Sequence, residues 1–123
     1  MAYLINLPVF EDDRGSLIVA EKVLPFKIKR FYYIYNLKSK RGGHRHKKAI
    51  QALICINGSC EVYINNGNDK QILLLNKPNQ CLVLEPQDWH TMDKFAKNTS
   101  ILVFASEYYD KDDYICEEYD DRV

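Results

Sequence analysis

The sequence predicts an all-β protein that folds as a sandwich or barrel, closed or nearly closed. Runs rich in β-branched and aromatic residues follow one another along the chain, and turn residues separate them about every 8–12 positions. Helical periodicity is weak throughout. The chain has 123 residues, 46% of them hydrophobic, which suits one domain with a single core. We therefore expect one domain over residues 1–123.

The predicted strands begin with Ile28–Tyr35, a run rich in β-branched and aromatic residues without glycine or proline. Ala49–Ile56 is the next strand, and Asn57-Gly58 ends it. An Asn-Gly pair is the strongest short signal for a hairpin, because a type I′ turn needs positive φ at both central positions. The pair therefore predicts a hairpin that leads into Cys60–Ile64.

A second Asn-Gly pair, Asn66-Gly67, precedes a further strand at Gln71–Leu75. Pro78-Asn79 then breaks the chain, and the two remaining strands are expected at Cys81–Leu84 and Ile101–Ala105, with a turn at Pro86 between them. The best candidate for helix is a short piece after Tyr109.

The charge of the chain is balanced but unevenly distributed. There are 17 basic and 17 acidic side chains, and a net charge of zero argues against a dedicated nucleic-acid binder. From Lys27 to Lys48, however, there are nine basic residues and no acidic one, and two of the three histidines lie in this stretch. The stretch predicts a local positive site for an anionic small molecule.

The cysteines and the apolar runs indicate the compartment. None of the four cysteines forms a C-x-x-C pair, and three of them lie inside apolar runs, as small buried residues of a reducing compartment do. The first residues lack the pattern of a signal peptide. The longest apolar runs are far shorter than the ~20 residues that span a bilayer. We expect a cytoplasmic protein without a membrane partner.

The spacing of the histidines gives the first resemblance to a known family. Gly43–His46, Gln51 and Gly58 form the pattern G-H-x-H, four residues, Q, six residues, G, which resembles the first motif of the cupin superfamily. Glu85–His90 matches the second cupin motif in length, with Gln87 in place of its usual glycine. All three histidines thus fall on cupin ligand positions. The resemblance implies a small cupin-type jelly-roll β-barrel.

The same motif argues against a metal. His44 and His46 are two positions apart and point to the same side of an extended strand. Gln51 follows five positions after His46, so it shares their face only if a β-bulge intervenes. It also replaces the glutamate of metal-binding cupins with a neutral amide, which is a poor ligand for a divalent cation. We therefore expect no metal and no cofactor, and interpret the histidines as proton-transfer groups.

A more specific resemblance covers about residues 5–120. Asp13–Leu17, Phe26–Ile34 and Arg41–Lys48, with residues 54–60 and 105–115, look like segments of the sugar-nucleotide 3,4-ketoisomerases, cupins that act on dTDP-4-keto-6-deoxyglucose. One departure is Arg45, which stands where a small residue is expected; its side chain should point away from the pocket. The resemblance implies a homodimer that binds a dTDP-linked keto sugar. The 3-keto product would supply an aminotransferase that makes 3-amino-3,6-dideoxy sugars for bacterial glycans.

The implied reaction moves the keto group from C4 to C3 through an enediol. It needs a base with a pKa near 7, and histidine, at about 6.5, is suited to this. The resemblance assigns catalysis to His44, His46 and Tyr33. Tyr32 is the less favoured tyrosine, because neighbouring strand residues face opposite ways and the sequence does not say which faces the pocket. The implied substrate-binding residues are Arg14, Arg30 and Arg41 at the pyrophosphate, Gln51 and His90 on the pocket floor, and Tyr32 near the thymine.

Three alternative functions stay open at this point. They are a 3,5-epimerase acting on the same substrate, a metal-dependent cupin oxygenase, and a sugar-nucleotide-binding module without catalysis. The sequence also leaves open which of His44 and His46 is the base, and which C4 epimer forms.

Overall fold

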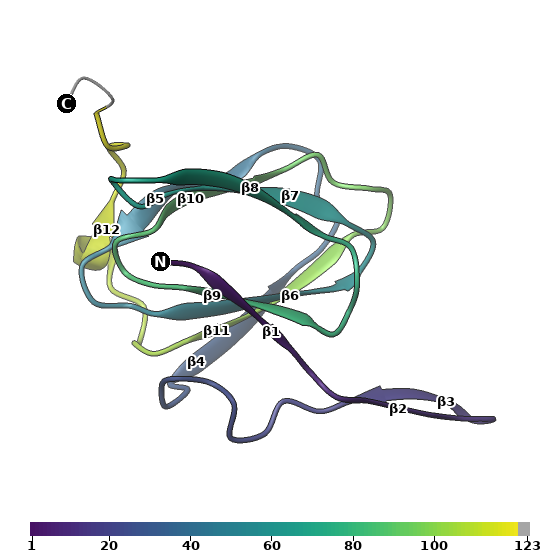
Figure 1. The fold of residues 1–123 in the computed structure, drawn as a ribbon. Helices are drawn as coiled ribbons and strands as arrows, with labels where there is room; N and C mark the ends of the chain where they lie inside the picture. Colours follow the sequence, from purple (N-terminus) through teal and green to yellow (C-terminus); the bar gives the residue numbers. More distant parts are fainter. Residues whose placement is uncertain (121–123) are drawn as a thin grey trace.

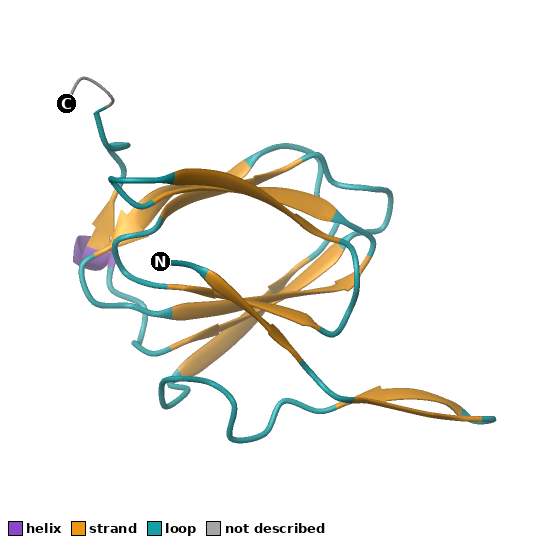
Figure 2. Cartoon of the chain, viewed as in Figure 1, coloured by secondary structure: helices purple, strands orange, loops and turns teal. Residues whose placement is uncertain are grey.

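Two five-stranded antiparallel sheets face each other within residues 1–120, the part of the chain that the computed structural model describes (Figure 1). Nearly all of this part is strand and loop (Figure 2). No strand pairing joins the two sheets within residues 1–120, so the jelly roll closes by packing of side chains. The all-β, jelly-roll prediction is confirmed.

The first sheet has the strand order β1-β9-β6-β11-β4, with β1 Tyr3–Asn6, β9 Gln80–Leu84, β6 Gln51–Asn57, β11 Ser100–Ala105 and β4 Arg30–Ile34. The second has the order β12-β5-β10-β7-β8, with β12 Tyr114–Ile115, β5 Arg41–His46, β10 Trp89–Asp93, β7 Cys60–Asn65 and β8 Lys70–Leu75. Strands β2 Val9–Asp12 and β3 Gly15–Ile18 form a separate hairpin. A 3₁₀ turn, η1 Lys111–Asp113, precedes β12, at the place where the sequence predicts a short helical piece.

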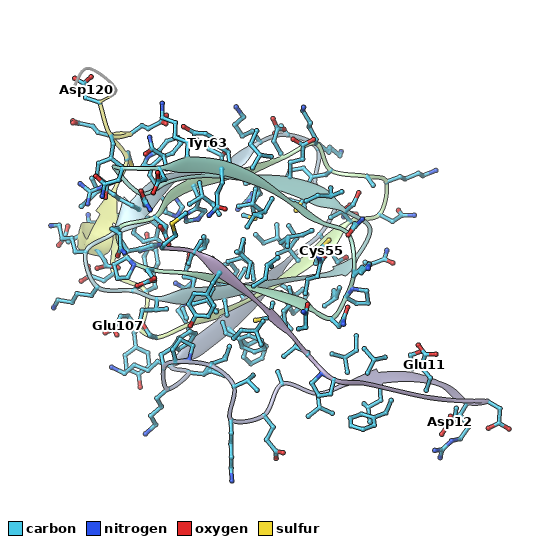
Figure 3. All side chains as sticks on the ribbon, in the orientation of Figure 1. Glu11, Asp12, Cys55, Tyr63, Glu107 and Asp120 are labelled. Atoms are coloured by element: carbon cyan, nitrogen blue, oxygen red, sulfur yellow. The ribbon has the colours of Figure 1, made fainter. Side chains whose placement is uncertain are left out.

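The core lies between the two sheets, where side chains fill the space (Figure 3). Alternation along each strand decides which residues enter it: on β11, Ile101 and Val103 are buried, whereas Leu102 and Phe104 face outward. Each fully buried aliphatic side chain stabilises the fold by about 1.5–3 kcal/mol relative to exposure. Cys55 and Cys60 belong to this core, and all four cysteines are free thiols.

The two Asn-Gly turns have different outcomes. Asn66-Gly67 lies between paired strands, β7 and β8, so the second hairpin is confirmed. The hairpin at Asn57-Gly58 is wrong, because β6 pairs with β9 and β11 while β7 pairs with β8 and β10. Gly58 (φ +82°) carries the chain from one sheet to the other and lies so close to Thr99 that a Cβ would be 2.3 Å from its Oγ1. Close approach therefore explains this glycine better than a type I′ turn does.

The β2–β3 hairpin projects from the sheets as an arm, with Glu11 and Asp12 near its tip (Figure 3). Its apolar side chains Phe10 and Leu17 are 58% and 61% exposed. A two-stranded hairpin is marginal by itself, so the arm needs a surface to pack on. Within residues 1–120 no helix is long and apolar enough to cross a bilayer.

Candidate active site

A cavity of about 420 Å³ opens between the two sheets. It is lined by residues of six strands: Arg30, Tyr32, Ile34, Arg41, Gly42, His44, Gln51, Leu53, His90, Met92, Val103 and Tyr114. Six of the nine residues that the sequence predicts for the site are among them. The other three, His46, Tyr33 and Arg14, are not among the residues that line the cavity.

The three histidines form a cluster at one wall. β5 and β10 are neighbours, with His90 directly opposite His44. The ring of His44 lies 5.0 Å from that of His90 and 5.1 Å from that of His46, measured between ring centres. Gly42 allows the two strands to come this close, because a Cβ there would be 2.8 Å from the His90 carbonyl oxygen. The predicted convergence of the histidines is confirmed.

Burial keeps two of these imidazoles neutral at pH 7. The pKa of His44 is lowered to about 4 by burial and by the neighbouring His46. Burial lowers the pKa of His90 to about 3. The sequence predicts a base titrating near 7, and the difference arises because an imidazolium loses its hydration between the sheets. Within residues 1–120, no group of three or more His, Cys, Asp and Glu side chains is placed to hold a metal ion.

His46 differs from the other two histidines because it has a carboxylate partner. Its Nδ1 donates to Asp113 Oδ2 at 2.9 Å, and both residues are buried. The same carboxylate accepts from the backbone N–H groups of Lys48, at 2.8 Å, and Ala49, at 3.3 Å. Burial lowers the pKa of His46, and Asp113 opposes this by stabilising the imidazolium. The pair fixes the tautomer and orientation of His46.

Tyr32 faces the cavity and Tyr33 does not, against the expectation for Tyr33. Tyr32 pairs with Val103 across β4 and β11 and faces the cavity with it. Tyr33 lies on the outer face of the same sheet, is 63% exposed, and stacks on Tyr35 with ring centres 6.1 Å apart. Burial raises the pKa of Tyr32, so its hydroxyl is protonated at pH 7.

Gln51 reaches the cavity without a β-bulge. It begins β6 in the first sheet, whereas His46 ends β5 in the second, so the chain changes sheet between them. The odd spacing therefore does not decide which side Gln51 faces. Its amide Nε2 donates to the Tyr32 hydroxyl oxygen at 3.3 Å.

Two of the three predicted arginines lie at the cavity. Arg30 and Arg41 both line it, and the Arg30 guanidinium lies over the ring of Tyr32, 4.7 Å from its centre. Arg14 is on the β2–β3 arm, where its Nε donates to Asp12 at 3.1 Å, so it does not reach the cavity of its own chain. Arg45 lies over Tyr119, 4.6 Å from the ring centre and away from the cavity, as predicted.

The structure adds two residues that have no role in the sequence-based site. Asp113 holds His46, and Tyr114 stands against His44 and His46 with ring centres 4.7 and 4.6 Å away. Asp113 ends η1, and Tyr114 begins β12 and pairs with His46 on β5. They belong to a segment that carries the family resemblance, which is the one signal in the sequence that points to them.

Asp113→Asn is expected to lower the free energy of unfolding at pH 7 by about 1–3 kcal/mol, because a charged, buried acceptor is lost. Burial tends to raise the pKa of Asp113, but hydrogen bonds from Lys48, His46 and Ala49 lower it below its usual value. Its contribution is therefore present above the unfolded value of about 3.9 and disappears as the pH falls through the lower folded value. Denaturant unfolding at several pH values checks this. An equal difference between the two proteins at pH 7 and at pH 2–3 would contradict it.

The fold and the cavity define a cupin-type protein with acid–base groups between its sheets. The family model described as "FdtA: WxcM-like, C-terminal" matches residues 2–122. A TDP-4-oxo-6-deoxy-alpha-D-glucose-3,4-oxoisomerase of Aneurinibacillus thermoaerophilus is 45% identical over 116 residues, which cover 91% of this chain and 84% of that protein. The chain therefore belongs to the FdtA family of sugar 3,4-ketoisomerases and is an enzyme of that family.

Solved structures agree with this assignment. A 3,4-ketoisomerase from Helicobacter canadensis superposes with a TM-score of 0.90 at 40% identity and covers 94% of this chain and 90% of its own. A single-site mutant of QdtA from Thermoanaerobacterium thermosaccharolyticum, in complex with TDP-4-keto-6-deoxyglucose, superposes with a TM-score of 0.89 at 39% identity, covering 94% and 87%. These relatives favour a ketoisomerase over the 3,5-epimerase, the oxygenase and the binding module.

Proposed function

We propose that this enzyme converts dTDP-4-keto-6-deoxy-D-glucose to its 3-keto isomer by metal-free acid–base catalysis. The observation that carries the proposal is the pairing, in one cavity, of a neutral imidazole (His44) with a protonated phenol (Tyr32). The family supplies the reaction, since the relatives with this fold are named for it. The product would be a substrate for an aminotransferase, and we place the enzyme in the cytoplasm.

His44 is the better candidate for the base, because it lines the cavity whereas His46 lies behind it. In the first step the imidazole takes the C3 proton, and the C4 carbonyl oxygen receives a proton to give the enediol. In the second step the C3 hydroxyl loses its proton, C4 gains one, and the carbonyl is now at C3. A dianionic diphosphate nearby would raise the pKa of His44 from about 4 toward neutrality and make it a stronger base.

The protonated Tyr32 is placed to donate to the developing enolate oxygen. A donor aimed at the atom where charge develops stabilises the transition state more than the ground state. Arg30 and Arg41 would hold the pyrophosphate, because a guanidinium offers two parallel N–H groups to phosphate oxygens. Gln51 and His90 complete the floor of the cavity.

A homodimer would explain the β2–β3 arm. An apolar groove of about 610 Å³ lies on the outer face of the first sheet, with Ile54, Leu102 and Phe104 among its lining residues. Exposed aromatic residues of β4 lie on the same face of that sheet. A second copy could cover this face while its arm brings Arg14 to the neighbouring cavity. Arg14 would then be a substrate-binding residue, but in the other subunit.

Mixing two inactive variants tests this arrangement. When equal amounts of Arg14→Ala and His44→Asn subunits are exchanged at random, about half of the dimers are mixed. One of the two sites in each mixed dimer is intact, so the mixture is expected to regain about one quarter of wild-type activity. Activity is measured after mild denaturation and renaturation of the mixture. Matched mixtures of each variant with itself are the control. If mixing restores nothing while size-exclusion chromatography shows mixed dimers, Arg14 does not act across the interface.

The proposed reaction is tested with the substrate itself. Incubation of the enzyme with dTDP-4-keto-6-deoxyglucose labelled with ¹³C at C3 and C4 is expected to move the carbonyl resonance from C4 to C3. A wild-type enzyme that binds the sugar nucleotide but leaves the carbonyl at C4 would contradict the proposal.

A further inference from the structure

We propose that Gln51 is a positioning residue: its amide sets the direction of the Tyr32 hydroxyl, so that the phenol can only donate into the cavity. The inference rests on the proposed ketoisomerase function. It goes beyond a binding role for Gln51, because it assigns the residue to the proton-donating half of the reaction.

The first step is the geometry of the contact. Gln51 is 3% exposed at the start of β6, and Tyr32 lies in the middle of β4, with β11 between them in the sheet. The Gln51 Nε2 to Tyr32 Oη distance is 3.3 Å. An amide nitrogen has protons and no acceptor site, so it must donate to the phenol oxygen. The hydroxyl proton of Tyr32 must then point elsewhere, and Tyr32 lines the cavity.

The second step is what holds the amide in this orientation. Gln51 is 3% exposed at the start of β6, so the packing around it limits the rotation of its side chain. The Tyr32 hydroxyl oxygen is the partner that accepts from its NH₂ group.

The third step is why an amide is needed. An ionised carboxylate at position 51 has no protons to donate. It would instead accept a hydrogen bond from the Tyr32 hydroxyl, which would turn that O–H away from the cavity. The two side chains have nearly the same shape, and only the direction of the hydrogen bond differs. A glutamate would therefore keep the packing and remove the donor.

Gln51→Glu tests the inference by steady-state kinetics. At pH 8 we expect kcat to fall about 10²-fold, to the level of Tyr32→Phe, with KM changed little. Adding Tyr32→Phe to Gln51→Glu should lower kcat less than about threefold further, because both changes remove the same donor. Gln71→Glu makes the same chemical change on β8, outside the residues that line the cavity, and should leave kcat unchanged.

The pH profile separates this role from a structural one. As the pH falls, the carboxylate introduced by Gln51→Glu becomes protonated and donates to Tyr32 again, so the activity of this variant should recover toward wild type. A defect in packing would not recover with pH. The inference is overturned if Gln51→Glu keeps the wild-type kcat at pH 8. It is also overturned if the kcat losses of Gln51→Glu and Tyr32→Phe multiply in the double variant.

A readout without turnover keeps the inference distinct from the proposed function. In protein labelled with [¹³Cζ]tyrosine, with Tyr32→Phe used for assignment, NMR titration gives the pKa of Tyr32. Loss of the amide donor in Gln51→Leu should raise that pKa above the wild-type value. An unchanged pKa overturns the inference whatever the substrate is. A raised pKa in an enzyme that fails to move the carbonyl supports the hydrogen bond and contradicts only the proposed function.

Discussion

His44→Asn is expected to lower kcat for the keto shift about 10²- to 10⁴-fold, the usual contribution of a positioned base. Asparagine keeps the polarity of the side chain but cannot accept the C3 proton. TDP affinity should stay near wild type, because Arg30 and Arg41 are untouched. Progress curves with the labelled substrate give kcat, and calorimetry gives the affinity for TDP.

His46→Asn is the matched comparison, since it makes the same change two positions along β5. It breaks the hydrogen bond to Asp113, so we expect a lower unfolding temperature as well as a lower kcat. His44→Asn should leave the unfolding temperature almost unchanged. If His44→Asn retains wild-type kcat and His46→Asn does not, the two histidines have to be exchanged in the mechanism.

Tyr32→Phe is expected to lower kcat about 10²-fold, whereas Tyr33→Phe should change it by less than about twofold. The two variants remove the same hydroxyl from neighbouring residues of β4. Only Tyr32 faces the cavity, and Tyr33 lies on the outer face of the sheet. Both variants keep the ring, so circular dichroism and thermal unfolding should match wild type.

The outcome that would contradict this assignment is the reverse order of the two effects. If Tyr33→Phe were inactive and Tyr32→Phe active, the outward tyrosine would act in catalysis and the cavity would not be the site of the keto shift. Equal, small effects would remove both tyrosines from the mechanism and leave proton donation to another group, for which Tyr114 is the nearest candidate.

Local patterns predicted part of the strand set, but not most of the strand partners. Turn residues and β-branched runs mark six of the ten strands of the two sheets (β4, β6, β7, β8, β9 and β11), because these preferences act over a few residues. They did not mark β1, β5, β10 and β12. The partner of β6 depends on which apolar faces meet across the core. The Asn-Gly signal therefore predicted a hairpin where Gly58 instead carries the chain between sheets beside Thr99.

The residues of the candidate site could likewise be predicted only in part from local patterns. Period-two alternation shows that Tyr32 and Tyr33 face opposite ways, but only the pairing of Tyr32 with Val103 shows which one faces inward. Asp113 lies 67 positions after His46, and no local pattern links them. Their contact depends on β12 joining the edge of the second sheet beside β5.

Proton NMR of the reaction in D₂O tests the central claim most directly. The wild-type enzyme and dTDP-4-keto-6-deoxyglucose should give a product with its carbonyl at C3 and deuterium at C4, because C4 is reprotonated from the enediol. The coupling constants at C4 in a partly protonated sample would also identify the epimer. Exchange of the C3 and C5 protons with the carbonyl still at C4 would contradict the account and indicate an epimerase.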